Sequence, residues 1–128
     1  MAVEMTNWNN WCGLTQVTPK EVTTPTSASE LAEEITKAAS SGRRLKMPGT
    51  GHSFTSIAAS DDILVRSQGL QGIIGVDADN LTVTARAGTR LKDLNSGLER
   101  LGYSLHNMGD IAEQTIAGAT STGTHGTG

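Results

Sequence analysis

The segment Arg44-Leu45-Lys46-Met47-Pro48-Gly49-Thr50-Gly51-His52-Ser53 runs from a short stretch of strand type straight into consecutive small residues. A strand that leads into such a loop exposes several backbone N–H groups in a row, and a concave set of these donors binds phosphate oxygens. The glycines also let a ligand come close to the backbone. The segment therefore indicates a phosphate-binding loop, although residues 49–53 taken alone favour a plain glycine-rich turn.

Two common nucleotide-binding motifs do not fit this loop. The P-loop requires a lysine after its second glycine, and none follows Gly51; the dinucleotide fingerprint requires a third glycine, and position 54 is Phe. His52 offers a phosphate contact, a metal ligand or a covalent bond to a cofactor. Metal binding is not favoured, because the histidines at 52, 106 and 125 lack short paired spacing and no carboxylate cluster joins them. For any single histidine, a hydrogen-bonded surface role is the default.

The flanking sequence predicts a mixture of helices and strands. Ser27 and Glu30 form a capping box, and apolar residues at helical spacing predict a helix from about residue 28 to 41. Further patterns predict a strand at 63–65, an antiparallel hairpin of 73–77 and 81–85, and a second helix from Leu91 to Leu101 ended by Gly102. This order of elements indicates a mixed α/β or α+β fold.

The two ends of the sequence are less regular. Residues 1–26 indicate an irregular arm or short strand, with breaks at Pro19 and Pro25. Residues 118–128 are small and polar, as in a disordered tail, but they lack the Lys and Glu that such tails favour. The preceding Thr115-Ile116-Ala117 indicates a packed turn. We therefore interpret the last segment as a ligand-binding loop through which the chain is cut.

Composition excludes several classes of function. The chain has 128 residues, enough for one compact domain, and 13 acidic against 10 basic residues give a net charge of −3 without long runs. This balance indicates neither a nucleic-acid partner nor a polybasic membrane patch. Met1 to Met5 lack signal-peptide character, no stretch approaches the length of a membrane span, and Cys12 is alone. We expect a soluble, cytoplasmic protein.

Four motifs in a fixed order identify a resemblance. They are Trp8-x-x-Trp11, Pro48-Gly49-Thr50-Gly51-His52-Ser53-Phe54, Asn107-Met108-Gly109-Asp110, and Thr115-Ile116-Ala117-Gly118 followed by Ser121-Thr122-Gly123-Thr124-His125-Gly126-Thr127-Gly128. The chain resembles the vanillyl-alcohol oxidase/p-cresol methylhydroxylase type of FAD-linked oxidoreductase over nearly its whole length. The resemblance is closest to the aldonolactone oxidases and dehydrogenases, that is gulonolactone and arabinonolactone oxidases, and to the alditol oxidases.

The resemblance implies an α+β fold, namely the amino-terminal part of a two-lobed FAD-binding domain with mixed sheets and flanking helices. The first lobe is expected at about residues 14–70 and the second, truncated one from about residue 71, with the substrate domain absent. The implied function is oxidation of a sugar-derived alcohol or aldonolactone by hydride transfer to covalently bound FAD, with oxygen or another acceptor taking the electrons. An alditol (xylitol-type) oxidase, or a non-catalytic flavin-binding fragment that needs the remaining carboxyl-terminal chain as its partner, are the alternatives.

The resemblance also assigns site residues. His52 would bond the flavin 8α carbon, and the loop around it would wrap the FAD pyrophosphate. Gly109, as a small residue near the flavin carbon that meets oxygen, favours an oxidase. No catalytic base and no metal ligand is assigned within this chain, which alone is expected to lack turnover. The full set of expected FAD contacts is Met47, Pro48, Gly49, Thr50, Gly51, His52, Ser53, Gly109, Asp110, Thr115, Gly118, Thr122, Gly123, Thr124 and His125.

Overall fold

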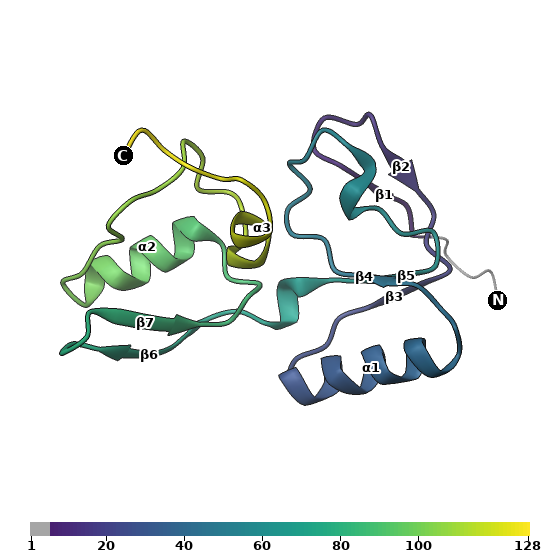
Figure 1. The fold of residues 1–128 in the computed structure, drawn as a ribbon, viewed down its shortest axis with the longest axis horizontal. Helices are drawn as coiled ribbons and strands as arrows, with labels where there is room; N and C mark the ends of the chain where they lie inside the picture. Colours follow the sequence, from purple (N-terminus) through teal and green to yellow (C-terminus); the bar gives the residue numbers. More distant parts are fainter. Residues whose placement is uncertain (1–5) are drawn as a thin grey trace. The chain divides into compact units, whose positions relative to one another are not determined.

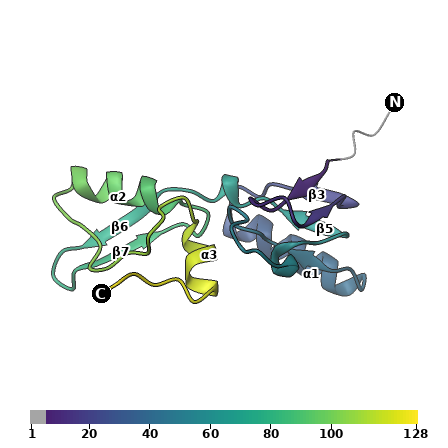
Figure 2. The same ribbon diagram turned by 90° about the horizontal axis from the view of Figure 1, so that it is seen from above.

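The chain divides into two compact units. The structure, a computed structural model, describes residues 6–128 (Figures 1 and 2). One unit ends at Gly69 and the other begins at Leu70. The expectation that residues 1–5 form no signal peptide lies outside the described residues.

The first unit is built on a small parallel sheet. Its strands β3, Glu21–Thr23, β4, Leu45–Lys46, and β5, Ile63–Val65, lie in the order β3-β5-β4, all parallel. Before them, β1, Trp8–Asn9, pairs antiparallel with β2, Gln16–Val17. Short 3-10 turns cover Ser56–Ala58 and Ser67–Gly69. Residues 6–26, the described part of the expected arm or short strand at 1–26, thus contribute three short strands.

Helix α1, Ala28–Ser40, covers this sheet (Figure 1). The Ser27 hydroxyl caps it by accepting from the Glu30 N–H, as the capping box predicts. The Glu30 carboxylate accepts from the N–H of Thr26 instead of Ser27, and this bond lowers the pKa of Glu30. The central strand β5 is buried along its whole length, as expected for a strand with neighbours on both sides. Ala38 packs with Ile63 and Val65, and Leu31, Leu45 and Met47 surround them.

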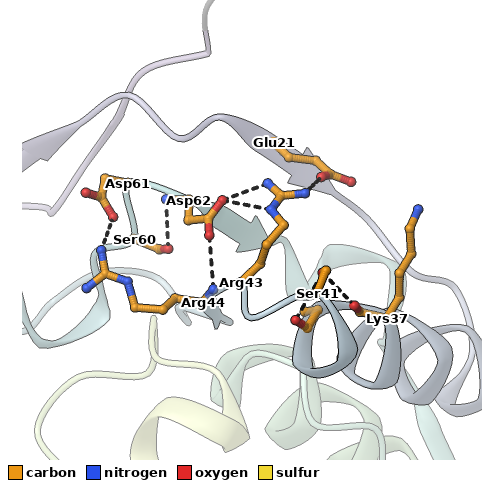
Figure 3. A network of polar contacts seen from close by, with 9 residues as sticks. Glu21, Lys37, Ser41, Arg43, Arg44, Ser60, Asp61 and Asp62 are labelled. Atoms are coloured by element: carbon orange, nitrogen blue, oxygen red, sulfur yellow. Dashed lines mark hydrogen bonds and ion pairs between the residues drawn. The ribbon is translucent and has the colours of Figure 1, made fainter.

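Charged residues join the three parallel strands at their amino-terminal ends (Figure 3). The Arg43 guanidinium binds Asp62 Oδ1 through Nε at 3.0 Å and Nη2 at 2.7 Å, and it donates from Nη1 to Glu21. Asp62 Oδ2 accepts the Arg44 N–H at 3.0 Å, whereas the Arg44 side chain pairs with Asp61 at the surface. The Arg43 hydrogen bonds, followed by the Arg44 N–H, hold the pKa of Asp62 below its ordinary value.

The second unit pairs a hairpin with a helix. Strands β6, Ile73–Asp77, and β7, Thr82–Ala85, are antiparallel, and α2, Leu91–Arg100, lies along them in both views (Figures 1 and 2). The Asp77 carboxylate closes the hairpin turn by accepting from the N–H groups of Asp79 and Asn80. Leu94 and Leu98 are the buried residues of α2. The hairpin and α2 agree with the sequence prediction.

One element departs from the sequence prediction. The segment expected as a packed turn at 115–117 begins a six-residue helix, α3, Ile116–Ser121. The Thr115 hydroxyl caps α3 by accepting from the Gly118 N–H at 3.1 Å, and the N–H groups of Ile116 and Ala117 donate to the carbonyls of Thr89 and Ala87. These tertiary contacts explain why a Gly- and Thr-rich stretch is helical despite low intrinsic propensity. Taken together, the helices and sheets confirm the α+β class.

We predict that Asp62→Asn lowers the urea midpoint of unfolding at pH 7, because the asparagine carries no charge to pair with Arg43. Since the pKa of Asp62 is lowered in the fold, its stabilisation is present above the ordinary aspartate pKa of about 3.9 and is lost as the pH falls through the lower folded value. The difference between wild type and variant should therefore narrow in acid.

Asp61→Asn is the matched control, because Asp61 pairs with Arg44 in solvent, where both side chains are exposed. It should leave the midpoint nearly unchanged at every pH. Equal effects of the two substitutions would contradict the role given to Asp62.

Candidate functional site

Residues 47–53 leave the carboxyl end of β4 as an irregular loop. Pro48 and Gly51 are buried, and the Met47 side chain packs against the core of the first unit. Within the described part of the chain, the backbone N–H groups of residues 49–53 donate to no protein acceptor. Residues 49–53 are buried or half-buried, and a row of N–H groups without a protein acceptor on such residues marks a place suited to an anion.

The amino-terminal arm holds this loop through a buried asparagine. The Asn10 side chain, 1% exposed, donates from Nδ2 to the Ser53 carbonyl at 2.9 Å and accepts the Thr15 N–H on Oδ1 at 3.0 Å. The Asn10 N–H donates to the Thr15 carbonyl, and the Asn10 carbonyl accepts from the Gly13 N–H. Asn10 therefore closes the turn of the arm and links it to the loop with one side chain.

A second contact lies on the other side of His52. The Trp11 N–H donates to the Gly51 carbonyl at 2.7 Å. Gly51 has φ +73°, and a Cβ there would lie 3.2 Å from Cζ2 of Trp8. Position 51 thus needs glycine both for its left-handed backbone and for its close approach to the arm.

The His52 ring lies between two neighbours. The ring planes of His52 and Trp11 are stacked, with centroids 5.7 Å apart and an interplanar angle of 22°. The Thr50 hydroxyl is 2.8 Å from Nδ1 of His52. Nδ1 is therefore occupied, while Nε2 has no hydrogen-bond partner among the residues that the structure describes. The ring is held at one edge and along one face.

In the second unit, α3 and the segment after it carry most of the remaining predicted residues. The Thr115 hydroxyl accepts from the Gly118 N–H, and Thr115 is buried. The Thr122 hydroxyl donates to the Gly118 carbonyl and lies 3.1 Å from the Thr124 hydroxyl. Gln114 binds Thr124 through its side-chain amide. Most of the threonine hydroxyls that sequence analysis assigns to a ligand thus also have partners within the chain.

The loop at 107–110 lies against the last residues of the chain. A Cβ at Gly126 would overlap the Met108 carbonyl oxygen, and a Cβ at Gly109 would lie 2.9 Å from the Thr124 methyl. Asn107 donates to the Gly128 carbonyl at 3.3 Å. The structure therefore gives a packing reason for glycine at position 109, and the expected access of oxygen there stays a prediction. Asp110 and His125 are exposed.

The predicted site residues are divided between the two units. Residues 47–53 lie together in the first, and those from 109 to 125 lie together in the second. Sequence reasoning missed Asn10, which resembles its neighbours Asn7 and Asn9 in type and differs only in burial. It also missed Thr89, whose buried hydroxyl accepts the Gly72 N–H and donates to the Arg86 carbonyl.

Among residues 6–128, no three His, Cys, Asp or Glu side chains form a group able to hold a metal ion. In the same residues, no helix has both the length and the apolar character needed to cross a membrane.

Comparison with known families agrees with this geometry. Residues 19–128 match the family described as FAD binding domain. The chain belongs to this family. L-gulono-1,4-lactone dehydrogenase of Mycobacterium tuberculosis is 42% identical over 121 residues, which cover 94% of this chain and 28% of that protein. D-arabinono-1,4-lactone oxidase of Eremothecium gossypii is 35% identical over 123 residues, 93% of this chain and 23% of that protein. The FAD-binding domain therefore spans about a quarter of the length of these relatives.

Solved structures show the same fold. A solvent-stable cholesterol oxidase superposes with a TM-score of 0.80 at 26% identity, covering 95% of this chain and 24% of that chain. The cholesterol oxidase of B. sterolicum superposes with a TM-score of 0.79 at 20% identity, covering 98% and 25%. The FAD-binding domain thus has the fold of known oxidase structures, and its resemblance to vanillyl-alcohol oxidase-type flavoproteins is confirmed.

The loop chemistry fits the FAD pyrophosphate. A pyrophosphate presents several anionic oxygens, and residues 49–53 present unpaired N–H donors with few side chains in the way. No acidic residue lies within residues 47–53 to repel it. The donor set of the FAD-binding domain is therefore suited to the diphosphate part of its cofactor.

We predict that Gly126→Ala destabilises the flavin-free chain by about 1–3 kcal/mol, because the added methyl group meets the Met108 carbonyl and forces the two segments apart. Gly123→Ala, where a Cβ meets nothing within 4 Å, should change stability by about 0.5 kcal/mol or less. Urea unfolding of both variants measures the difference. A tolerated Gly126→Ala would contradict the packing of residues 107–110 against 124–128.

Proposed function

We propose that the FAD-binding domain belongs to a flavin-dependent oxidoreductase that oxidises an aldonolactone or a related sugar-derived alcohol, with FAD bonded covalently to His52. The similarity to lactone dehydrogenases and oxidases over more than nine-tenths of the chain supports the activity. The observation that carries the cofactor assignment is the row of N–H groups at 49–53, His52 among them, that have no protein acceptor within residues 6–128.

The residues of the first unit have distinct tasks in this proposal. The backbone of Met47, Pro48, Gly49, Thr50, Gly51 and Ser53 binds the pyrophosphate. A ring nitrogen of His52 would hold the flavin covalently through the methyl carbon at its position 8. Such a bond would replace one N–H of the imidazole and one C–H of the methyl group, and the two electrons released would need an acceptor such as dioxygen.

The residues of the second unit supply further contacts in this proposal. Gly109, Asp110, Thr115, Gly118, Thr122, Gly123, Thr124 and His125 are assigned to the same cofactor. A Cβ at Gly123 meets no protein atom within 4 Å, which supports an approach of cofactor to the backbone there. Because Thr115 and Thr122 already bond within the chain, we assign them a contact through the remaining hydrogen-bond capacity of their hydroxyls.

Bound FAD would be the acceptor of the hydride that leaves the carbinol carbon of the substrate. The FAD-binding domain holds the cofactor and orients it, while the base that deprotonates the hydroxyl is assigned to a part of the protein beyond this sequence. Its partners are then a sugar-type small molecule, an electron acceptor and the carboxyl-terminal remainder. We propose the cytoplasm as its compartment.

An alditol oxidase is the second candidate activity. It shares the motifs of the first unit, and the chain carries no substrate-binding residue that separates the two. The relatives named for lactones favour the lactone. A flavin-binding fragment that is completed by the remaining polypeptide, without turnover of its own, is the non-catalytic alternative.

We predict that the full-length protein keeps the mass of one FAD after denaturation and that His52→Ala loses this mass. The variant lacks the nitrogen that forms the bond but retains the loop backbone, so it should still bind FAD reversibly and be yellow before denaturation. Intact mass spectrometry with a visible spectrum measures both.

His106→Ala is the matched control, since His106 is exposed and lies in the second unit. It should keep the covalent flavin. Retention of the flavin mass in His52→Ala, or its absence from the wild type, would refute the attachment.

We predict that L-gulono-1,4-lactone or D-arabinono-1,4-lactone reduces the flavin of the full-length protein about tenfold or more faster than xylitol, as expected where a site is shaped for one substrate class. Anaerobic bleaching of the flavin absorbance measures this rate without an electron acceptor. Faster reduction by xylitol would favour the alditol oxidase, and no reduction by any of the three would contradict the proposed substrate class.

A further inference from the structure

The amino-terminal arm forms hydrogen bonds to the residues immediately before and immediately after His52 in the sequence. Asn10 donates to the carbonyl of Ser53, and Trp11 donates to the carbonyl of Gly51. Two successive residues of the arm therefore fix the two residues that flank His52. The bond from Asn10 spans 43 residues of sequence, so it is a tertiary contact and no part of a local turn.

The Asn10 contact is a specific one. Its side chain is 1% exposed, and both of its polar atoms have partners, Thr15 on Oδ1 and Ser53 on Nδ2. Removal of this amide would leave the Ser53 carbonyl and the Thr15 N–H without partners. A buried hydrogen bond of this kind is costly to lose. Asn9, by contrast, is exposed, and its side chain reaches only the carbonyl of Asn10.

Unlike the Asn10 side chain, the Trp11 ring is not buried. Its side chain is 68% exposed, and the ring contact that the structure gives it is the stack on His52. Burial of the indole thus does not account for its position. The stack covers one face of the imidazole, while Thr50 holds Nδ1 at the ring edge. Together these contacts restrict the rotation of the His52 ring and leave Nε2 without a protein partner in residues 6–128.

We propose that Asn10 and Trp11 are positioning residues of the flavin site. Asn10 fixes the backbone of the loop, and Trp11 fixes the plane of the His52 imidazole, so that the ring is preorganised for its bond to the flavin. Neither residue takes part in the bond itself. The inference rests on the proposed attachment of FAD to His52. It adds Asn10 and Trp11, which lie before the residues that match the FAD binding domain family, to the cofactor site.

The test follows the formation of the bond in the full-length protein. Protein produced without flavin is mixed with saturating FAD, and samples are denatured at intervals and weighed by mass spectrometry. Asn10→Ala and Trp11→Ala should each slow attachment about tenfold, the effect of losing one well-made contact of about 1.4 kcal/mol. Total flavin bound before denaturation should stay near the wild-type amount, because the N–H groups of the loop remain.

Matched variants separate positioning from loss of folding. Asn9→Ala removes the same side chain one residue earlier, and Trp11→Phe keeps an aromatic face over His52; both should attach FAD within about twofold of wild type. Trp11→Ala is the decisive variant, since it keeps the backbone donor to Gly51 and removes only an exposed ring. Attachment at the wild-type rate in Asn10→Ala or Trp11→Ala overturns the role of that residue.

The wild-type control distinguishes failure of this inference from failure of the proposed function. If wild type binds FAD without a covalent bond, the attachment proposal alone fails, and the dissociation constant of FAD becomes the readout. A rise of about tenfold in Asn10→Ala and Trp11→Ala, with none in Asn9→Ala and Trp11→Phe, then supports positioning, and an unchanged constant overturns it. If wild type binds no flavin, both proposals fall.

Discussion

A single guanidinium joins the amino-terminal ends of the three parallel strands. Arg43 lies just before β4, Glu21 begins β3, and Asp62 lies just before β5. The ion pairs of Arg43 with Glu21 and Asp62 therefore align the amino-terminal ends of the three strands. The strands are only two or three residues long, and their backbone bonds alone would fix this register weakly. Since the strands are parallel, their carboxyl ends also share one edge, and the loop at 47–53 leaves β4 there. Ligands of open α/β sheets bind at this edge.

The loop itself is held by a different kind of force. Met47 packs against the apolar core of the first unit, and the loop that follows it is held through backbone carbonyls that accept hydrogen bonds from the arm. Hydrogen bonds are directional, so they define where a backbone lies more closely than apolar contact does. They also use the carbonyls of Gly51 and Ser53 and spare the N–H groups. The loop is thereby held in place through its carbonyl oxygens, while its N–H groups remain available to an anion.

The limits of sequence reasoning follow from which signals are local. Helix α1 is predictable because its Ser27 cap and its apolar spacing lie within one segment, and β5 because three apolar residues stand between polar ones. Helix α3 is not, since its first turn depends on carbonyls of Thr89 and Ala87, far along the chain. The assignment of residues 47–53 to a cofactor rests on their resemblance to a family and stays a prediction. Asn10 is not, because burial alone distinguishes it from Asn9, and burial arises only when residues 43 apart meet.

Because Trp11 stacks on His52, the intrinsic tryptophan fluorescence of the protein is sensitive to this site. Indole fluorescence responds to the groups that touch the ring, and one of the two tryptophans of this chain touches the residue proposed to carry the cofactor. Emission from Trp11 therefore reports the chemical state of the imidazole. A flavin absorbs light in the region where indole emits, so its arrival at His52 would quench that emission by energy transfer. Loading of the site can thus be followed in real time, without a label and without a substrate.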